Sequence, residues 1–207
     1  MSSEHCHAIV LTNLSYGESD LIVTLFTLEH GKLRGFARGA RASRRRFGGS
    51  LEPANRLELL LTPKDEGLSR IERIEANLTT PGLRERLESL ALALYACELT
   101  DALAPEGHPL PRLFRLLTAL LEHSAQAPGS MEDRCFFEIN LLNILGYRPL
   151  LDGPELQTLR LCLQTGIFGN VCFSDNELSA AARLLDREIT RHCTRPLKSR
   201  IFLEDVS

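Results

Sequence analysis

The sequence predicts an α+β protein in which a small, closed or nearly closed β-barrel precedes a helical domain. Two patterns predict this class. Up to about residue 80 the chain reads as five short strands separated by turns, and beyond it apolar residues repeat at helical spacing. The chain contains no internal repeat and no low-complexity tract, which favours two ordinary folded domains, at 1–79 and 80–207.

The N-terminal part should form strands over 7–12, 20–28, 31–39, 55–61 and 68–76. Turn signals separate these runs: Ser-Tyr-Gly at 15–17, His-Gly at 30–31, Gly-Gly-Ser at 48–50 and a Pro-to-Gly stretch at 63–67. Because short strands in an open sheet leave unpaired edges, five of them within so short a segment favour a barrel that closes on itself.

The C-terminal part should contain at least four helices. The first is expected to begin at Thr80-Pro81, an N-cap followed by proline, and to end before Pro105. The second should span 111–124, the third should follow Ser130 and stop at Gly146, and the fourth should follow a capping box of Ser174 and Glu177. The stretch 154–173 is ambiguous, and we expect a short helix followed by an extended turn.

The composition is that of a water-soluble globular protein, with 207 residues, 43% hydrophobic and 25% charged. No apolar run approaches the ~20 residues of a membrane span. The first residues do not combine a basic segment with an apolar one, as a secretory signal would. We therefore expect a cytoplasmic protein with no membrane partner.

A local concentration of positive charge is the most informative feature of the chain. Between Lys32 and Arg46 there are seven basic residues and no acidic one. The formal charge of the whole chain is −3, so the rest of it carries −10, which is −3 less the +7 of this window. Such an asymmetry indicates a polyanionic partner, of which nucleic acid is the commonest.

The strand at 31–39 should divide its side chains between two faces, because side chains alternate along a strand. One face is small and apolar, as a barrel interior requires, and consists of Leu33, Gly35 and Ala37. The other places three cations around one aromatic ring, and consists of Lys32, Arg34, Phe36 and Arg38. Arg41, Arg44, Arg45 and Arg46 continue the charge into a loop with Phe47 beside it and glycines for flexibility.

Cations that follow a phosphate chain and a ring that stacks on a base together favour binding of a single strand. If five to seven phosphates are neutralised, log K against log salt should slope at roughly −3.5 to −5, at about 0.7 per phosphate. Two plainer interpretations stay open. The charges could be a solvated surface, and Phe36 could pack beneath the loop.

Nothing in the sequence indicates an enzyme, a cofactor or a metal. It lacks a G-x-S-x-G, an H-E-x-x-H and a Walker A motif. The six cysteines form no C-x-x-C pair. His5-Cys6-His7 looks like a metal motif, but on a strand the two histidines face away from the cysteine, and a frayed terminus is the simpler interpretation.

These residues resemble the RecO family of bacterial recombination mediators. The resemblance lies in AIVL at 8–11, YGESD at 16–20, LFT at 25–27, HGKL at 30–33, ARGAR at 37–41, FE at 137–138, LGY at 145–147 and RPLKSRIFL at 195–203. It covers most of the chain. It implies an OB-fold followed by a helical domain, with the family's basic positions on the third strand at Lys32, Arg34, Arg38 and Arg41.

The resemblance also implies a function in DNA repair and recombination, close to the nucleoid. Members bind single- and double-stranded DNA, anneal strands, act with RecR to load the recombinase, and work through the single-strand DNA-binding protein. Many carry a four-cysteine zinc module, whereas the corresponding part of this chain is shortened and keeps only Cys162, Cys172 and Cys193. We expect the module to be absent or degenerate.

The helical domain offers two further basic sets. Arg183, Arg187 and Arg191 recur on one helix face opposite its apolar stripe, as a solvated surface or as a second DNA or partner surface. The acidic tail of the single-strand DNA-binding protein needs an apolar pocket rimmed by cations, which Arg112, Arg115 or Arg134 could supply. Three alternative functions stay open: an OB-fold RNA-binding protein, an adaptor for an acidic protein, and a small hydrolase.

Overall fold

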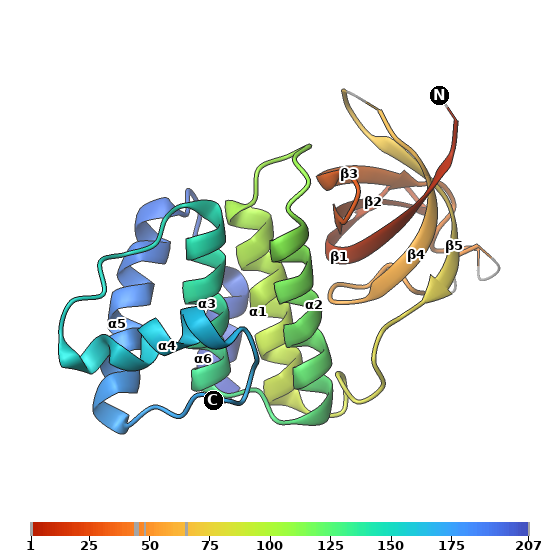
Figure 1. Cartoon of the computed structure of the whole chain (residues 1–207). Helices are drawn as coiled ribbons and strands as arrows, with labels where there is room; N and C mark the ends of the chain where they lie inside the picture. The colour runs from red at the N-terminus through yellow and green to blue at the C-terminus, as the bar shows by residue number, and fades with distance from the viewer. Residues whose placement is uncertain (1, 44–45, 48, 65, 207) are drawn as a thin grey trace. The chain divides into compact units, whose positions relative to one another are not determined.

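The computed structural model describes residues 2–43, 46–47, 49–64 and 66–206. It confirms the predicted class, a closed five-stranded barrel followed by helices (Figure 1). The chain forms two compact units. The first comprises 1–80 together with 104–114, and the second comprises 81–103 and 115–207. The contribution of 104–114 to the first unit was not indicated by the sequence.

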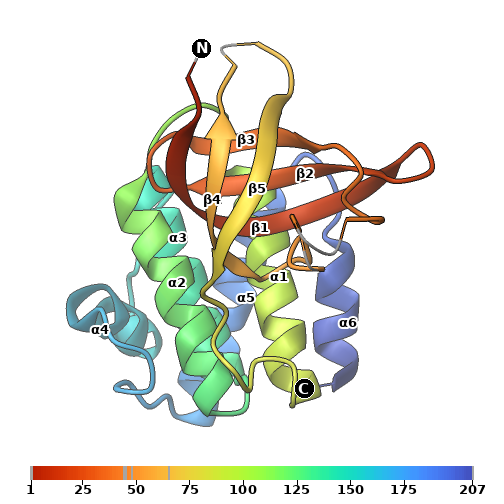
Figure 2. The ribbon, with the colours of Figure 1, turned by 90° about the vertical axis from the view of Figure 1, so that its right-hand side faces the viewer.

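The barrel strands are β1 (Glu4–Tyr16), β2 (Asp20–Thr27), β3 (Gly31–Ala37), β4 (Arg56–Thr62) and β5 (Ser69–Asn77) (Figure 2). Their order is β1-β2-β3-β5-β4, and β4 closes the barrel by pairing with β1. All pairs are antiparallel except β3 with β5, where Gly35 lies opposite Ser69 and Phe36 opposite Arg70. This parallel pairing brings β5 beside the strand that carries the basic residues.

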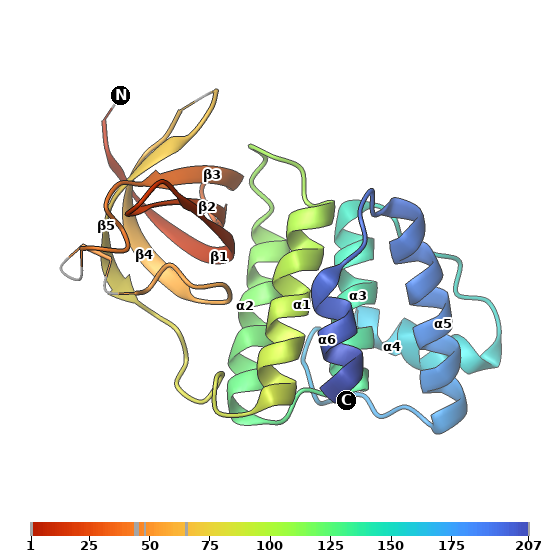
Figure 3. The same cartoon turned by 180° about the vertical axis from the view of Figure 1, so that it is seen from behind.

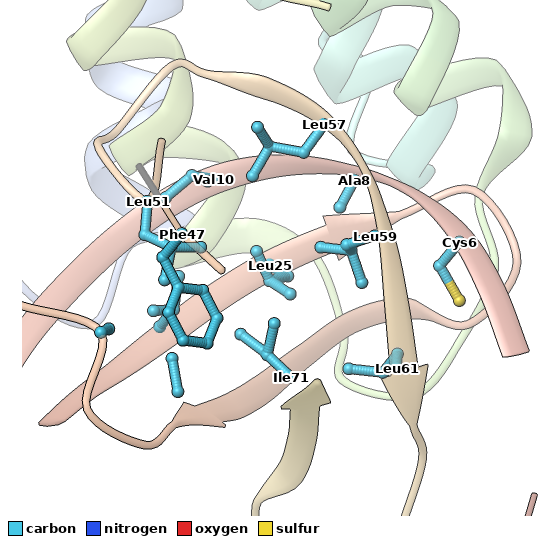
Figure 4. Close-up of a cluster of buried hydrophobic side chains, with 13 residues drawn as sticks. Cys6, Ala8, Val10, Leu25, Phe47, Leu51, Leu57, Leu59, Leu61 and Ile71 are labelled. Carbon is cyan, nitrogen blue, oxygen red and sulfur yellow. The ribbon is translucent and has the colours of Figure 1, made fainter. Parts of the chain in front are cut away.

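The interior of the barrel is filled by one side chain in two along each strand. Val10, Leu25, Leu59 and Ile71 are all buried in a single cluster. Phe47, which comes from the loop after β3, joins them and is also fully buried (Figure 4). Burying a side chain of this size contributes about 2 kcal/mol, so Phe47 fixes the loop to the barrel.

The helices of the second unit are α1 (Leu87–Leu103), α2 (Pro111–Gln126, which begins in the first unit), α3 (Met131–Leu145), α4 (Gln157–Thr165), α5 (Asp175–His192) and α6 (Lys198–Val206), with a 3-10 turn at Pro154–Leu156. Ser130 and Ser174 cap α3 and α5 as predicted, and Gly146 ends α3 with a φ of 83°. The short helix expected within 154–173 is α4.

Two expectations about the helices were wrong. The first helix begins at Leu87 rather than at Pro81, because Gly82 has a φ of 98° and a right-handed helix cannot pass through that conformation. The helix α6 was not predicted at all. It lies beside α1 (Figure 3), where the Glu98 carboxylate accepts hydrogen bonds from the backbone N–H groups of Lys198 and Ser199.

Candidate nucleic-acid interface

The strand β3 alternates as the sequence predicts. Ala37 is completely buried, Leu33 packs against the barrel core, and a Cβ on Gly35 would lie 2.7 Å from the Ile71 side chain. Arg34 is exposed on the opposite face, and Phe36 is half-buried there. The absence of a side chain at Gly35 therefore leaves space for Ile71 inside the barrel. Arg34 and Phe36, on either side of Gly35, face outward.

Lys32 is the exception, and its expected exposure was wrong. Only 8% of this residue is accessible. The segment 104–110 covers this end of β3, because the Lys32 carbonyl accepts a hydrogen bond of 2.8 Å from the Gly107 N–H, and its backbone pairs with Glu106. Lys32 is thus not part of the exposed cationic face.

The loop after β3 is held to the barrel rather than free to follow a ligand. Arg46 donates to the Arg38 carbonyl at 2.7 Å, and its guanidinium lies 5.1 Å from the centre of the buried Phe47 ring. Arg41 donates to the Glu18 carbonyl at 3.3 Å. Phe47 thus lies in the loop beside the charges as predicted, but its ring is buried in the barrel core, which the sequence did not indicate. Arg44 and Arg45 lie outside the described residues.

The positive charge of the arginines on β3 and in the segment after it is not neutralised within the described part of the chain. None of the carboxylates described there pairs with Arg34, Arg38, Arg41 or Arg46, all of which are exposed. The contacts of Arg41 and Arg46 are made to carbonyl oxygens, which leave the positive charge in place. By contrast, Arg73 on β5 pairs with Glu75 at 2.8 Å.

An aromatic pair lies next to these cations. Tyr16, the last residue of β1, is 56% exposed, and its ring meets that of Phe36 edge to face. Across the strands, Leu14 pairs with Ile22, and Ile22 pairs with Phe36, so an apolar row connects β1 to β3. From the sequence, Tyr16 was expected in the turn at 15–17. The signal that could have placed it on the strand is its two-residue spacing from Leu14.

A groove of about 810 Å³ runs over this face of the barrel. Its lining includes both rings of the pair, Ile22 and Leu68, and the cations Lys64 and Arg70. Arg70 could not be predicted from the sequence, because its place beside Phe36 depends on the parallel pairing of β3 with β5. Glu72 also lines the groove, where it pairs with Arg70 at 3.2 Å and accepts a hydrogen bond from the Thr62 hydroxyl.

The motif at His5-Cys6-His7 divides as expected for a strand. Cys6 is buried in the core, and burial raises the pKa of its thiol to about 12. His5 lies 2.5 Å from Glu75, and His7 lies 2.9 Å from Glu29. Among the residues that the structure describes, no group of three or more histidine, cysteine or acidic side chains could hold a metal ion.

Arg134 in the helical unit was wrongly considered for the rim of a partner pocket. It is only 3% exposed, and it lies over the ring of Tyr95 at 5.1 Å. Its guanidinium donates to Glu138 at 2.7 Å and to Asp186 at 2.5 Å. Burial of such a charge requires these partners, so Arg134 holds α3 and α5 together and is not accessible to a ligand.

Comparison with known proteins gives a consistent result over the whole chain. Two family models match, Recombination protein O N terminal over residues 1–78 and Recombination protein O C terminal over residues 84–153. Proteins called DNA repair protein RecO are similar to the chain along its length. That of Pelobacter propionicus is 45% identical and covers 100% of this chain and 98% of its own, and that of Geobacter sulfurreducens is 44% identical with 98% of each covered. In the part of the chain that the structure describes, no helix is long and apolar enough to cross a membrane.

Proposed function

Since the chain belongs to the RecO family of DNA repair proteins, we propose that its barrel binds single-stranded DNA along the face that carries Tyr16, Phe36, Arg34 and Arg38. The observation that carries the proposal is the aromatic pair that lines a groove of about 810 Å³. Phe36 of this pair is flanked along the chain by Arg34 and Arg38, which are exposed and have no carboxylate partner among the described residues. Base stacking on such a platform and neutralisation of phosphates by flanking arginines are how sequence-tolerant single-strand binding works.

Two consequences follow for the mechanism. Arginines that neutralise phosphates lower the repulsion between two strands, so complementary strands pair faster without any catalytic residue. Because the stacking surface accepts any base and the cations contact only the backbone, binding should be tolerant of sequence. Double-stranded DNA would use the same cations but not the aromatic pair, so we expect it to bind less tightly than a single strand.

Because the chain belongs to the RecO family, the same proposal includes two specific protein partners. The chain would act with RecR to load the recombinase, in the cytoplasm and at the nucleoid. It would receive the acidic tail of the single-strand DNA-binding protein on its helical unit. A hollow of about 490 Å³ between the ends of α5 and α6 combines Ile189, Leu197 and the exposed Ile201 with two arginines, and it is our candidate for that tail.

The tail site can be tested by fluorescence anisotropy of a labelled tail peptide. Replacing Ile201 by glutamate should abolish binding, because it places a like charge in the apolar part of the hollow. Ile167, which is similarly exposed elsewhere in the helical unit, provides the matched control for the same substitution. Equal binding by both variants would show that the tail does not bind in this hollow.

The principal experiment is an annealing assay with two complementary oligonucleotides carrying a fluorescence donor and acceptor. The chain should accelerate pairing, and Arg34→Glu should remove most of the acceleration. Arg73→Glu changes the net charge of the same barrel equally, but at an arginine already paired with Glu75, so it should retain the activity. Equal effects of the two substitutions would contradict the proposal.

The alternative functions give different outcomes in related assays. Competition between DNA and RNA of one sequence separates a DNA-binding barrel from an RNA-binding one. If Arg34→Glu leaves nucleic-acid binding intact, the arginines are free for an acidic protein and the adaptor function is favoured. Turnover of nucleotides or phosphodiesters by the purified chain would instead support a hydrolase.

A further inference from the structure

A second hollow, of about 470 Å³, lies in the helical unit where the chain leaves α3 and passes the last turns of α5. One side is formed by the segment 146–150 and the other by α5, through Leu184, Arg187, Glu188, Arg191 and His192. All of these residues belong to the same compact unit. The hollow therefore does not depend on how the two units are arranged.

The aromatic part of this hollow is held in place by the end of α3. Gly146 ends that helix in the left-handed conformation, and the Tyr147 N–H donates to the Leu142 carbonyl at 2.8 Å. The Tyr147 ring stacks on His192, with ring centroids 4.2 Å apart and an angle of 17° between the planes. Tyr147 is nevertheless exposed. A flat aromatic surface is thus available at the rim of the hollow.

The charges around this aromatic surface are mainly positive and weakly paired. Arg187 and Arg191 lie one turn apart on α5, and each is 73% exposed and approaches Glu188 only at 3.8 and 3.7 Å. Exposed pairs at such distances contribute little and leave the guanidinium groups available. Arg148 is exposed across the hollow and pairs with none of the carboxylates that the structure describes.

Asp186 does not reduce this positive charge, although it lies next to Arg187 in the sequence. Its two carboxylate oxygens pair with the buried Arg134, at 2.5 Å, and with Arg200, at 2.8 Å. The hollow is therefore lined by three arginines and one carboxylate. The sequence left open whether the arginines of α5 form a solvated surface or a second binding surface. Where these arginines lie near Tyr147, positive charge exceeds negative charge.

We propose that this hollow is a second binding surface for single-stranded DNA. It combines, in the helical unit, the same elements as the barrel face: an exposed ring for a base and unneutralised arginines for phosphates. The lining includes the apolar Pro149, Leu150 and Leu184, but its three guanidinium groups and its stacked phenol and imidazole rings suit the phosphates and bases of a nucleotide. The inference rests on the proposed function of the barrel and deepens it, because one chain would then hold two strands on separate surfaces while they pair.

Photocrosslinking of the full chain to single-stranded DNA that contains 5-iodo-deoxyuridine tests the inference directly, since this base couples to nearby aromatic and histidine side chains. Mass spectrometry should find crosslinked peptides from the barrel groove and also from the segment with Tyr147 or the end of α5. Crosslinks in the barrel alone would overturn this inference and leave the proposed function standing. Crosslinks in neither place would overturn both.

A pair of matched variants tests the same surface in solution. Arg187→Glu with Arg191→Glu should lower the salt slope of DNA binding by about 1.4, from two lost phosphate contacts at about 0.7 each, and slow annealing on the order of tenfold. Arg112→Glu with Arg115→Glu makes the same charge change at exposed positions of α2 and should leave both values unchanged.

An acidic protein segment is the other possible occupant of a cationic hollow. Photocrosslinking with a hexaglutamate peptide that carries a benzophenone group, which inserts into nearby C–H bonds, distinguishes this occupant from DNA. If the peptide crosslinks beside Tyr147 while iodo-deoxyuridine DNA does not, the hollow is a peptide site and the inference is wrong. Thermal unfolding followed by circular dichroism verifies that each variant is folded, as expected for changes confined to exposed side chains.

Discussion

The ring of Tyr16 meets the ring of Phe36 edge to face, with centroids 6.1 Å apart and planes at 83°. Tyr16 ends β1 and Phe36 lies on β3, so the contact crosses the intervening strand β2. Edge-to-face geometry leaves the two rings at a steep angle, with ring surface left open towards the groove. Together they form an apolar platform on a barrel face that also carries the exposed Arg34.

This platform should contribute to the affinity for single-stranded DNA. We expect Tyr16→Ala to weaken binding by about 1–3 kcal/mol, the usual contribution of one stacked base, or on the order of ten- to a hundredfold in Kd. Tyr16→Phe keeps the ring and should bind like the parent protein. Anisotropy titrations with labelled oligonucleotides measure both. Loss of binding in the phenylalanine variant as well would show that the hydroxyl, not the ring, is required.

Lys32 and Arg34 should behave differently although they are two residues apart on one strand. Arg34→Ala should weaken DNA binding, since it removes an exposed cation. Lys32→Ala should leave the DNA affinity almost unchanged and instead lower the midpoint of urea unfolding, because Lys32 is buried beneath the segment that pairs with its backbone. A DNA-binding defect in Lys32→Ala with unchanged stability would contradict its burial beneath the segment 104–110.

The buried charges of the helical unit should matter for stability only as a set. Arg134→Ala leaves Glu138 buried without its cation, and we expect a loss of about 3–5 kcal/mol in the free energy of unfolding. Replacing both residues by leucine removes the unpaired charge and should be less damaging than the single change. Urea unfolding curves of the two variants compare these costs, and a milder effect of Arg134→Ala than of the double change would refute this account.

Glu177 should make the helical unit sensitive to acid. Hydrogen bonds from the Thr158 hydroxyl and from Ser174 lower the pKa of Glu177 from its ordinary value of 4.5 to about 2. A lowered pKa in the folded state means that the carboxylate stabilises the fold above pH 4.5 and loses this contribution as the pH falls towards 2.

Melting temperatures of the parent protein and of Glu177→Gln, measured by circular dichroism between pH 2 and 7, test this pH dependence. The parent should be more stable above about pH 4.5, and the difference should disappear towards pH 2. A constant difference over the whole range would mean that the charge of Glu177 is not responsible.

A metal chelator should leave the fold unchanged. Two of the three cysteines in the segment where we expect a zinc module to be absent or degenerate lie in different environments. Cys162 is buried, and burial raises the pKa of its thiol to about 12, whereas Cys172 is exposed. A thiol with so high a pKa is a poor ligand at neutral pH. We expect the same melting temperature with and without EDTA, and a metal content near zero by mass spectrometry.

The strands and capped helices could be predicted because their signals are local. Alternation along β3 placed Ala37 inside and Arg34 outside, and the serine caps of α3 and α5 lie within three residues of the groups they bond. The start of α6 has no such local signal. Its N-terminal N–H groups are satisfied by Glu98, about a hundred residues earlier in the chain.

The candidate site was only partly predictable for the same reason. Charge density identified Arg34 and Arg38 directly. Three outcomes depend on pairings between distant segments: the burial of Lys32 by 104–110, the contact of Tyr16 with Phe36, and the placement of Arg70 beside Phe36. None of them is encoded in the spacing of residues along a single strand.

The salt dependence of single-stranded DNA binding tests the central claim most directly. For the parent protein, log K against log salt should fall with a slope of roughly −3.5 to −5. In a variant with alanine at the four exposed arginines described on β3 and in the segment that follows it, Arg34, Arg38, Arg41 and Arg46, the slope should become shallower by about 3. A flat response in the parent protein, or the same slope in both proteins, would contradict the claim that a DNA strand lies along this side of the barrel.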